Sequence, residues 1–431
     1  MDPREINVSR KKRKRKPSPV RAEPAQRRQS AVHPRWKIVG VILVIAAGMW
    51  GLVQWESGRR ARRVEAFRSE TMRRLELGDW EGAEAMASRW AVEDPSPDAW
   101  MAAAQAAWEK ADAERVAFYL QQIPDPAPLD AYLRLGFIQM EALGDPLACV
   151  ATCNKTLEYF PDDTETHERL LYFYAMTCQS DLLRREVDRA VQAGADSLTS
   201  YAYLLSGQWL RFKNGVEVNQ RWLQKYPDEE VFLVGAVLNL TQHPMLEEIA
   251  RAEMPTADAE PRPREYAAQQ VHAMLQRFPQ NLELLAEEIR NLCRNGDVPQ
   301  VARLLAGAPA AALQDNRFWR YKGWLHAAQS EWPDAIAAYR RALEIAPWDW
   351  ASRLELASAI RATEGVAAAA DLQRTADRGK RLVIQIRGSQ NIHELEPPET
   401  YEQMRDYLRD CGRNDLADRI DRLLGAAGHS H

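Results

Sequence analysis

The residues of this chain that could react or hold a metal ion are few and scattered. Only five cysteines occur in 431 residues, and no two are spaced as C-x-x-C. This number and spacing argue against a disulfide framework and against a zinc site. Cys149 and Cys153 stand four residues apart on an expected helix, where a redox pair and two small packed residues are the alternatives. We favour packing.

The other residue types with catalytic potential form no recognisable arrangement. The eight histidines are dispersed, His167-Glu168 begins no metal-binding motif, and His429 and His431 lie in a terminal stretch. The chain contains no H-E-x-x-H, no G-x-S-x-G, no phosphate-binding P-loop and no G-x-G-x-x-G. We therefore expect no catalytic residues, no metal and no cofactor, and a protein that is not an enzyme.

What the sequence does show is regular spacing of bulky and small residues, which predicts the helices that would position any site. The clearest stretch is 317–350, where Trp319 is followed four residues later by Gly323. A second helix is expected to follow, with a face of small and aromatic residues and a proline at its end: Ala335, Tyr339, Ala342 and Pro347. Small residues allow two antiparallel helices to approach closely.

The same spacing recurs along the chain. Pro95, Pro161 and Pro227 are 66 residues apart, and Pro279 precedes Pro347 by 68. Trp80 and Ala83 stand 15 and 12 residues before Pro95, as Trp332 and Ala335 do before Pro347. Tyr132 and Gly136 reproduce the spacing of Trp319 and Gly323. A unit of about half of 66 to 68 residues is therefore repeated, and it is a helical hairpin.

These residues resemble the tetratricopeptide repeat, a 34-residue helical hairpin with the pattern W-x2-L-G-x2-Y…A-x3-F…P. Two positions depart from the pattern, because Lys322 stands where leucine is usual and His326 where tyrosine is usual. The resemblance covers most of residues 64–425 and implies an all-α solenoid of roughly ten stacked hairpins. It also implies binding of peptides or proteins, without naming a partner.

Composition divides the chain further. The expected organisation is a disordered basic tail at 1–36, a transmembrane helix at 37–56, a first hairpin array at 64–250, a proline-rich loop at 251–265, a second array at 266–390 and a terminal capping hairpin at 391–425. Within the second array, residues 381–388 are consistent with a strand or with the end of one long helix, and their 3/4 spacing of apolar residues favours the helix.

Residues 38–55 form an uncharged apolar run that is long enough to cross a bilayer. Trp36 and Lys37 stand at one end and Trp50 and Trp55 towards the other, as interfacial residues do. A cleaved signal peptide is the alternative. The 37 residues before the run and the lack of a clear cleavage site favour an uncleaved anchor.

The charge distribution suggests an orientation. Residues 1–37 hold 13 Lys and Arg against three acidic residues, a net charge of +10, while the rest has a net charge of −14. This tail favours a cytoplasmic N-terminus and an exported body, as in a bacterial inner-membrane protein that faces the periplasm. The basic run at 10–16 is an orientation signal, an anionic-lipid contact, a nucleic-acid contact or a nuclear address. No aromatics are interleaved with it, so we expect no specific nucleic-acid binding.

A repeat array offers a groove lined by the first helix of each hairpin. Arg317, Arg320 and Trp324 fall on the side of their helix that Trp319 and Gly323 do not use, and Phe137 holds the place next to Gly136. Two guanidinium groups near an indole would bind a carboxylate-bearing or extended peptide; a solvated helix face is the alternative.

The predicted function is a membrane-tethered scaffold for peptides or proteins. The alternative is an accessory or regulatory subunit of an envelope enzyme system, such as cytochrome maturation, secretion, or polysaccharide or cell-wall assembly.

Overall fold

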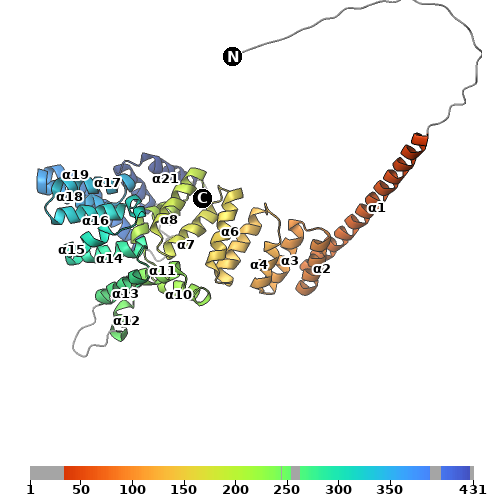
Figure 1. The fold of residues 1–431 in the computed structure, drawn as a ribbon, viewed down its shortest axis with the longest axis horizontal. Helices are drawn as coiled ribbons and strands as arrows, with labels where there is room; N and C mark the ends of the chain where they lie inside the picture. Colours follow the sequence, from red (N-terminus) through yellow and green to blue (C-terminus); the bar gives the residue numbers. More distant parts are fainter. Residues whose placement is uncertain (1–33, 244, 254–262, 389–398, 428–431) are drawn as a thin grey trace, which may run out of the picture. The chain divides into compact units, whose positions relative to one another are not determined.

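The described residues of the computed structural model are all helical or in connections, and they contain no strand (Figure 1). They are 34–243, 245–253, 263–388 and 399–427. The chain divides into two compact units, 1–63 and 64–431. The tail before residue 34, most of the proline-rich loop, the first part of the predicted capping segment, His429 and His431 lie outside the described residues.

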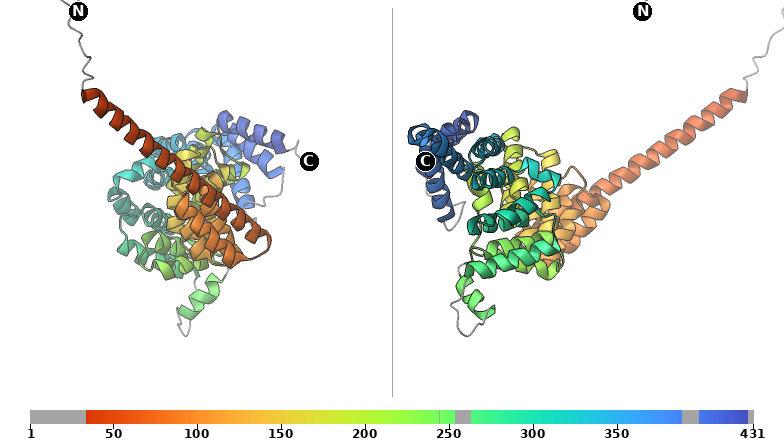
Figure 2. Two further views of the ribbon diagram at one scale, coloured as in Figure 1. Left: turned by 90° about the vertical axis from the view of Figure 1, so that its right-hand side faces the viewer. Right: turned by 60° about the vertical axis from the view of Figure 1, so that its left-hand side comes forward.

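Most consecutive helices of the second unit pack against one another (Figures 1 and 2). In order, the N-terminal helices are α1 (Pro34–Glu76), α2 (Trp80–Glu93), α3 (Pro97–Glu109), α4 (Ala113–Gln121), α5 (Leu129–Phe137), the π-helical turn η1 (Ile138–Ala142), α6 (Pro146–Tyr159), α7 (Thr164–Met176), α8 (Ser180–Ala193), α9 (Leu198–Ser206), the 3-10 turn η2 (Gly207–Trp209), α10 (Gly215–Lys225), α11 (Glu230–Leu240) and α12 (Leu246–Glu253). They are followed by α13 (Pro263–Arg277), α14 (Leu282–Asn295), α15 (Val298–Ala306), the 3-10 turn η3 (Ala310–Gln314), α16 (Asn316–Ala328), α17 (Trp332–Ile345), α18 (Trp350–Glu364), α19 (Val366–Gly388), α20 (Glu399–Asp410) and α21 (Asn414–Ala427).

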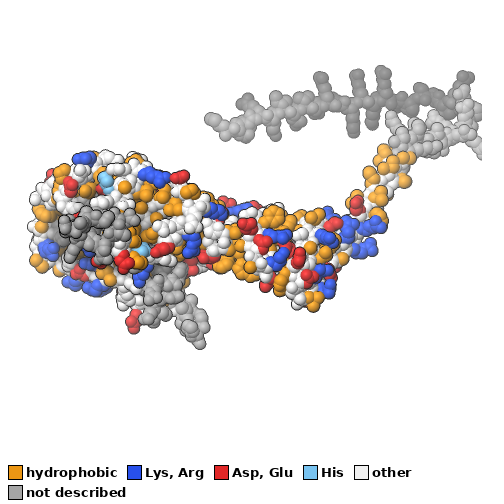
Figure 3. Space-filling model, turned by 90° about the horizontal axis from the view of Figure 1, so that it is seen from below, with side chains coloured by type: hydrophobic (Ala, Val, Ile, Leu, Met, Phe, Trp, Pro, Cys, Tyr) orange, Lys and Arg blue, Asp and Glu red, His pale blue; other side chains and the backbone are white. Residues whose placement is uncertain are grey.

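Helix α1 holds the predicted membrane span. Among the described residues, the stretch Val41–Glu76 is the one helix that is long and apolar enough to cross a membrane, and none of its most apolar window is buried. Figure 3 shows the apolar side chains along α1 and the basic side chains that follow them. The guanidinium group of Arg59 lies 3.9 Å from the centre of the Trp55 ring, as befits residues at the polar end of such a span.

Acidic residues in the short connections begin many of the helices. The side chain of Asp79 accepts a hydrogen bond from the Gly82 backbone at 3.1 Å, and that of Asp163 accepts one from the Thr166 backbone at 2.8 Å. The same N-cap is made by Asp112, Asp145 and Asp297. Each carboxylate accepts a hydrogen bond from a backbone N–H that the helix leaves unpaired. Its negative charge also interacts favourably with the positive N-terminal end of the helix dipole. The recurring acidic residues of the connections therefore fix where the helices start.

The small residues of the repeat pattern lie where helices touch. A side-chain carbon on Gly323 of α16 would stand 2.5 Å from the Tyr339 ring of α17, so only glycine fits there. Tyr339 is buried, and Ala335, Ala342 and Ala83 are fully buried. Trp80, Trp319 and Pro347 are half-buried, and Pro347 follows the end of α17. The hairpin predicted from the spacing is present, with glycine and alanine forming its close contact.

Residues 381–388 belong to the long helix α19, which confirms the helical alternative. Leu382, Val383 and Ile386 are buried on one side of it. This side contacts α9, and α20 contacts α9 as well. One apolar cluster therefore contains Tyr201 and Tyr203 of α9 together with residues of α19, α20 and α21.

A charged hydrogen bond also joins the C-terminal helices to the start of α9. Arg419 of α21 donates two hydrogen bonds to the buried Asp196, which precedes α9, one of them at 2.9 Å from Nε. Tyr201 donates a hydrogen bond to the same carboxylate.

The predicted boundary between two arrays remains a prediction about sequence organisation. In the structure, helices on both sides of it share one core.

Replacing Gly323 with alanine is expected to lower the stability of the folded chain by about 1–3 kcal/mol, because the new methyl group overlaps the buried Tyr339 ring. The matched control is Gly425→Ala near the end of α21, where a side-chain carbon meets no atom within 4 Å. There alanine should be neutral or slightly stabilising, because it favours the helix. Chemical denaturation followed by circular dichroism measures both. Equal effects at the two positions would contradict the close contact.

Candidate peptide-binding groove

Helix α5 carries an exposed aromatic residue at the position where the sequence predicts a groove. Phe137 is 46% exposed although it follows the buried Gly136. Trp108 at the end of α3 is 50% exposed, and its ring centre lies 6.4 Å from that of Phe137. Together they lie over a cavity of about 430 Å3 whose lining comes from α3, α4, α5, η1 and α7. Exposed large aromatics that face each other in a cavity are unusual on a solvated surface.

The cavity continues along the chain past Phe137. A second hollow of about 190 Å3 is lined by Phe137, Glu141 and the α7 residues Glu165, Glu168 and Tyr172, among others. Phe137 and Glu165 line both hollows. We call this continuous surface the α3–α5–α7 groove. It runs across the first helices of three consecutive hairpins, as the repeat resemblance implies.

Polar side chains along the groove are ordered by short contacts with each other. Arg134 donates hydrogen bonds to Asp130 at 3.0 Å and to Gln105 of α3 at 3.2 Å. Arg169 donates to Glu165 at 2.7 Å and to the Leu133 carbonyl of α5 at 3.0 Å. Both guanidinium groups of the lining are thus held by neighbours across helices.

The groove has more carboxylates than basic groups. Asp130, Glu165, Glu141 and Glu168 stand against the two engaged arginines. Its surface is therefore apolar at Trp108 and Phe137 and negatively charged around them. A segment that carries apolar or aromatic side chains next to Lys or Arg is its complement.

The repeat glycine also shapes this groove. A side-chain carbon on Gly136 would stand 2.6 Å from the Arg169 guanidinium nitrogen and 3.8 Å from the Cys149 sulfur. Because glycine leaves this space open, Arg169 can cross from α7 to the α5 carbonyl. Cys149 and its neighbour Cys153 are buried, with 3.9 Å between their sulfurs, and this contact together with burial raises the pKa of the Cys149 thiol. They pack beneath the groove rather than facing it.

Two of the predicted groove residues lie in the interior. Arg317 and Arg320 of α16 are only 6% and 5% exposed. Arg317 donates to Glu283 of α14 at 2.5 and 3.0 Å and to Asp315 at 2.6 Å. Arg320 donates to both oxygens of Asp349 at 3.1 and 2.8 Å. The prediction that these arginines face a groove is therefore corrected.

The physical reason is that acidic residues from other helices reach both guanidinium groups. Burial acts to lower the pKa of Arg317, but Asp315 and Glu283 outweigh it and hold the pKa well above the usual value. In the same way Asp349 outweighs burial and raises the pKa of Arg320. We call the five residues Arg317, Arg320, Glu283, Asp315 and Asp349 the α16 ion-pair network.

Trp324 is half-buried because it packs against the apolar cluster of α14 to α16. Helix α14 lies against α16, whereas Phe137 has no such cover and remains exposed. Sequence reasoning placed Phe137 in the groove and missed Trp108. A signal was present, since each of these aromatics stands near the C-terminal end of the first helix of its hairpin.

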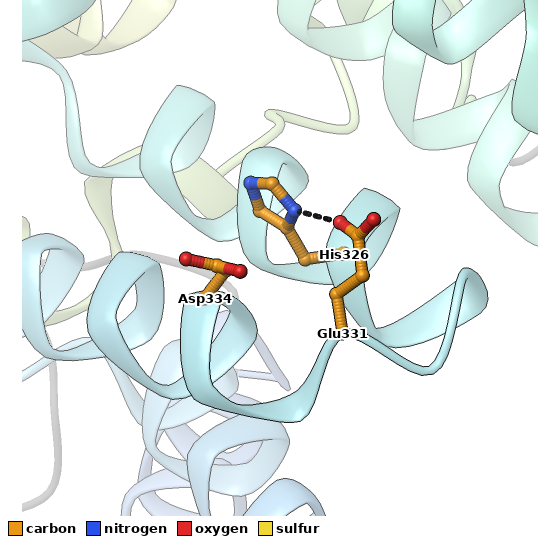
Figure 4. A group of neighbouring side chains, drawn as sticks. All are labelled: His326, Glu331 and Asp334. Atoms are coloured by element: carbon orange, nitrogen blue, oxygen red, sulfur yellow. Dashed lines mark hydrogen bonds and ion pairs between the residues drawn. The ribbon is translucent and has the colours of Figure 1, made fainter.

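One further group of polar side chains lies together at the turn between α16 and α17. Nδ1 of His326 is 2.7 Å from Glu331, and Asp334 lies nearby (Figure 4). Their potential ligand atoms fall within 4.8 Å of one another, and both carboxylates are exposed. His326 already contacts Glu331 across the turn, so the arrangement is that of an exposed pair that closes the hairpin.

Replacing Arg320 with alanine is expected to destabilise the chain by about 3–5 kcal/mol, because it leaves the carboxylate of Asp349 buried without its cation. Arg341→Ala is the control, since this arginine pairs with Glu344 while both side chains are largely exposed. It should cost less than about 1 kcal/mol. Denaturant titration of both variants checks the difference. A mild effect at Arg320 would mean that its side chain is solvated.

No family model matches the chain, and no curated protein matches it. Among solved structures, the chain is similar to the APC/C hetero-tetramer Cut9–Hcn1, with 12% identity, 84% of this chain and 72% of that chain covered, and a TM-score of 0.31. A tetratricopeptide repeat protein from Parabacteroides merdae gives 9% identity, 69% and 99% coverage and a TM-score of 0.29.

Yeast Tom70 gives 10% identity, 86% and 96% coverage and a TM-score of 0.25. The hairpins, their close contact at Gly323 and the absence of strands in the described residues are observed in this chain itself. They establish an all-α solenoid of stacked helical hairpins that is similar to the tetratricopeptide repeat.

Proposed function

We propose that this protein is a membrane-tethered, non-catalytic scaffold whose α3–α5–α7 groove binds an extended segment of a partner protein. The observation that carries the proposal is the exposure of Trp108 and Phe137 side by side in the groove. Large aromatics in a hollow are the residues that most often dominate binding energy at protein interfaces. The fold supplies the rigid helices that hold them.

The chemistry of the groove narrows the kind of segment that fits. Excess carboxylates beside the two aromatics favour a segment with an apolar or aromatic anchor flanked by Lys or Arg. The two lining arginines are already bound to neighbouring groups, so an acidic segment would have to break these contacts. The groove is therefore matched to a basic, amphipathic partner.

The tether is the second part of the proposal. The apolar run of α1 supports a single membrane span, and the basic tail supports a cytoplasmic N-terminus with the hairpins on the periplasmic side of a bacterial inner membrane. A contact of the tail with anionic lipid fits the same arrangement. The tether would hold the groove close to the membrane, where partners that are themselves in the envelope meet it at raised effective concentration.

The tether is tested by extraction and by reporter fusions. The full-length chain should remain in membranes after carbonate treatment and dissolve only in detergent. A phosphatase that works only in the periplasm should be active when fused after His431, and a fluorescent protein that matures only in the cytoplasm should be dark there. The opposite reporter pattern would place the hairpins in the cytoplasm, and carbonate release would remove the tether from the proposal.

The groove is tested by crosslinking from inside it. A photoreactive phenylalanine analogue at position 108 or 137 of the full-length protein in membranes should capture a discrete partner, which mass spectrometry identifies. The matched control is position 118, because Phe118 is equally exposed but does not line the groove. Replacing Trp108 and Phe137 together by alanine should weaken the captured interaction by about 2 kcal/mol or more, roughly thirtyfold.

The same double variant should melt at nearly the wild-type temperature, because exposed side chains contribute little to folding. Phe118→Ala should change neither binding nor stability. Capture of the same proteins from position 118 as from 108 would mean that the contacts are not specific to the groove. A double variant that is folded and binds its partner normally would overturn the assignment.

A further inference from the structure

A second pocket, separate in sequence from the groove, has five basic residues among the fifteen that line it. Its volume is about 460 Å3, and α13, α14, α18 and α19 form its walls together with η2. The cationic and aromatic residues of its lining are Arg264, Arg290, Arg294, Lys380, Arg387, Trp209 and Trp350. We call this cavity the basic pocket. It belongs to a part of the chain that the scaffold proposal does not use.

The charge of the basic pocket is strongly one-sided. Five cationic side chains face one carboxylate, that of Glu287. This carboxylate is already engaged, because it pairs with Arg290 and lies 3.9 Å from the buried Arg211 behind it. The chain beyond its N-terminal tail carries a net charge of −14, so such a concentration of positive charge does not follow from composition.

The cations of the basic pocket are close enough to disfavour one another. Burial and the proximity of Arg290 lower the pKa of Arg294. Burial, Arg211 and Arg290 lower the pKa of Arg387. Like charges that are partly withdrawn from water cost folding free energy. An anion among them would offset this cost by hydrogen bonding and by neutralising the field.

Several donors at the basic pocket have no acceptor within the part of the chain that the structure describes. They are the Nε atom of Arg290 and the indole nitrogens of Trp209 and Trp350, all buried. Buried donors are normally paired, so each unpaired one requires an explanation. The two indole rings lie 5.2 Å apart, and the Lys380 ammonium lies 5.9 Å from the Trp350 ring. These donors and cations belong to residues that line the same pocket.

We propose that the basic pocket binds a small molecule that carries a phosphoryl group with two or more negative charges. An arginine guanidinium group can donate two parallel hydrogen bonds to two phosphate oxygens. The indole groups of the lining and the amides of Gln242 and Asn291 would each add a single hydrogen bond. The volume is that of a small-molecule site, which is too small for a folded partner. The same chemistry fits inorganic pyrophosphate and an organic phosphate ester, for which the lining residues Val383 and Ile384 would contact the organic part.

Isothermal titration of the full-length protein in a nonionic detergent at low salt tests this proposal. The probes are inorganic pyrophosphate, glucose 6-phosphate and a short polyglutamate peptide. Wild type should bind at least one phosphoryl probe. Arg294→Gln combined with Arg387→Gln should weaken that binding by at least about tenfold. Tighter binding of glucose 6-phosphate than of pyrophosphate would identify an organic ester as the natural class, and the reverse order an inorganic one.

The matched control neutralises two exposed arginines that do not line the pocket, Arg340→Gln with Arg361→Gln. It keeps the same net charge as the pocket variant and should bind like wild type. Trp350→Phe is a second pocket variant that keeps an aromatic ring and removes one donor. It should weaken binding while a thermal melt shows an intact fold.

Three results would overturn the proposal. They are failure of wild type to bind either phosphoryl probe, an equal loss in the Arg340/Arg361 control, and binding of polyglutamate alone. The second result would assign the effect to overall charge, and the third would assign the pocket to acidic peptides. The pocket variant should melt no lower than wild type, because it removes repulsion between cations, so loss of binding would not reflect unfolding.

Discussion

The fully buried carboxylate of Asp349 constrains the arrangement of the C-terminal hairpins. It accepts hydrogen bonds from Arg320 and Asn316 of α16 at 2.8 Å each and from Gln208 of η2 at 3.2 Å. It also caps the start of α18. A charge withdrawn from water is tolerated only where such partners surround it. Helices α16 and α18 and the turn after α9 must therefore meet at this point.

The apolar contacts around Asp349 follow from that meeting. Trp348 precedes it and belongs to the same buried cluster as Tyr201 and Tyr203 of α9 and Tyr407 of α20. The hydroxyl of Tyr407 donates to the Trp348 carbonyl at 2.9 Å. Because the Asp349 carboxylate fixes the position of α18, the following helices α19 and α20 pack against α9. Arg419 of α21 then adds a hydrogen bond to Asp196, which precedes α9. Polar geometry sets the register, and burial of the aromatic side chains stabilises it.

How much of this was predictable depends on how far apart the interacting residues lie in the chain. The close contact of Gly323 with Tyr339 spans 16 residues and has a spacing signature, so the hairpin could be predicted. Arg317 pairs with Asp315 two residues away, but its other partner, Glu283, and the partner of Arg320 lie 34 and 29 residues away in neighbouring hairpins. Those of Arg419 lie 223 residues away. Helical spacing places an arginine on a face, but only the fold determines whether a carboxylate covers it. For that reason Phe137 is exposed in a hollow, as a groove residue must be, whereas the two arginines are buried.

Helix α14 connects the α16 ion-pair network to the basic pocket. Its Glu283 accepts from Arg317, and Glu287, one turn later on the same helix, pairs with Arg290 and lies near Arg211. Two carboxylates one turn apart on this helix therefore pair with cations of the network and of the pocket, and the pocket retains a surplus of positive charge. An anion bound there would act on the folded state alone, because the unfolded chain does not bring α13, α14, α18 and α19 together. By linkage, its binding would stabilise the same contacts that Asp349 organises. The repulsion between the surplus cations therefore destabilises this part of the chain, and a bound anion would remove that repulsion.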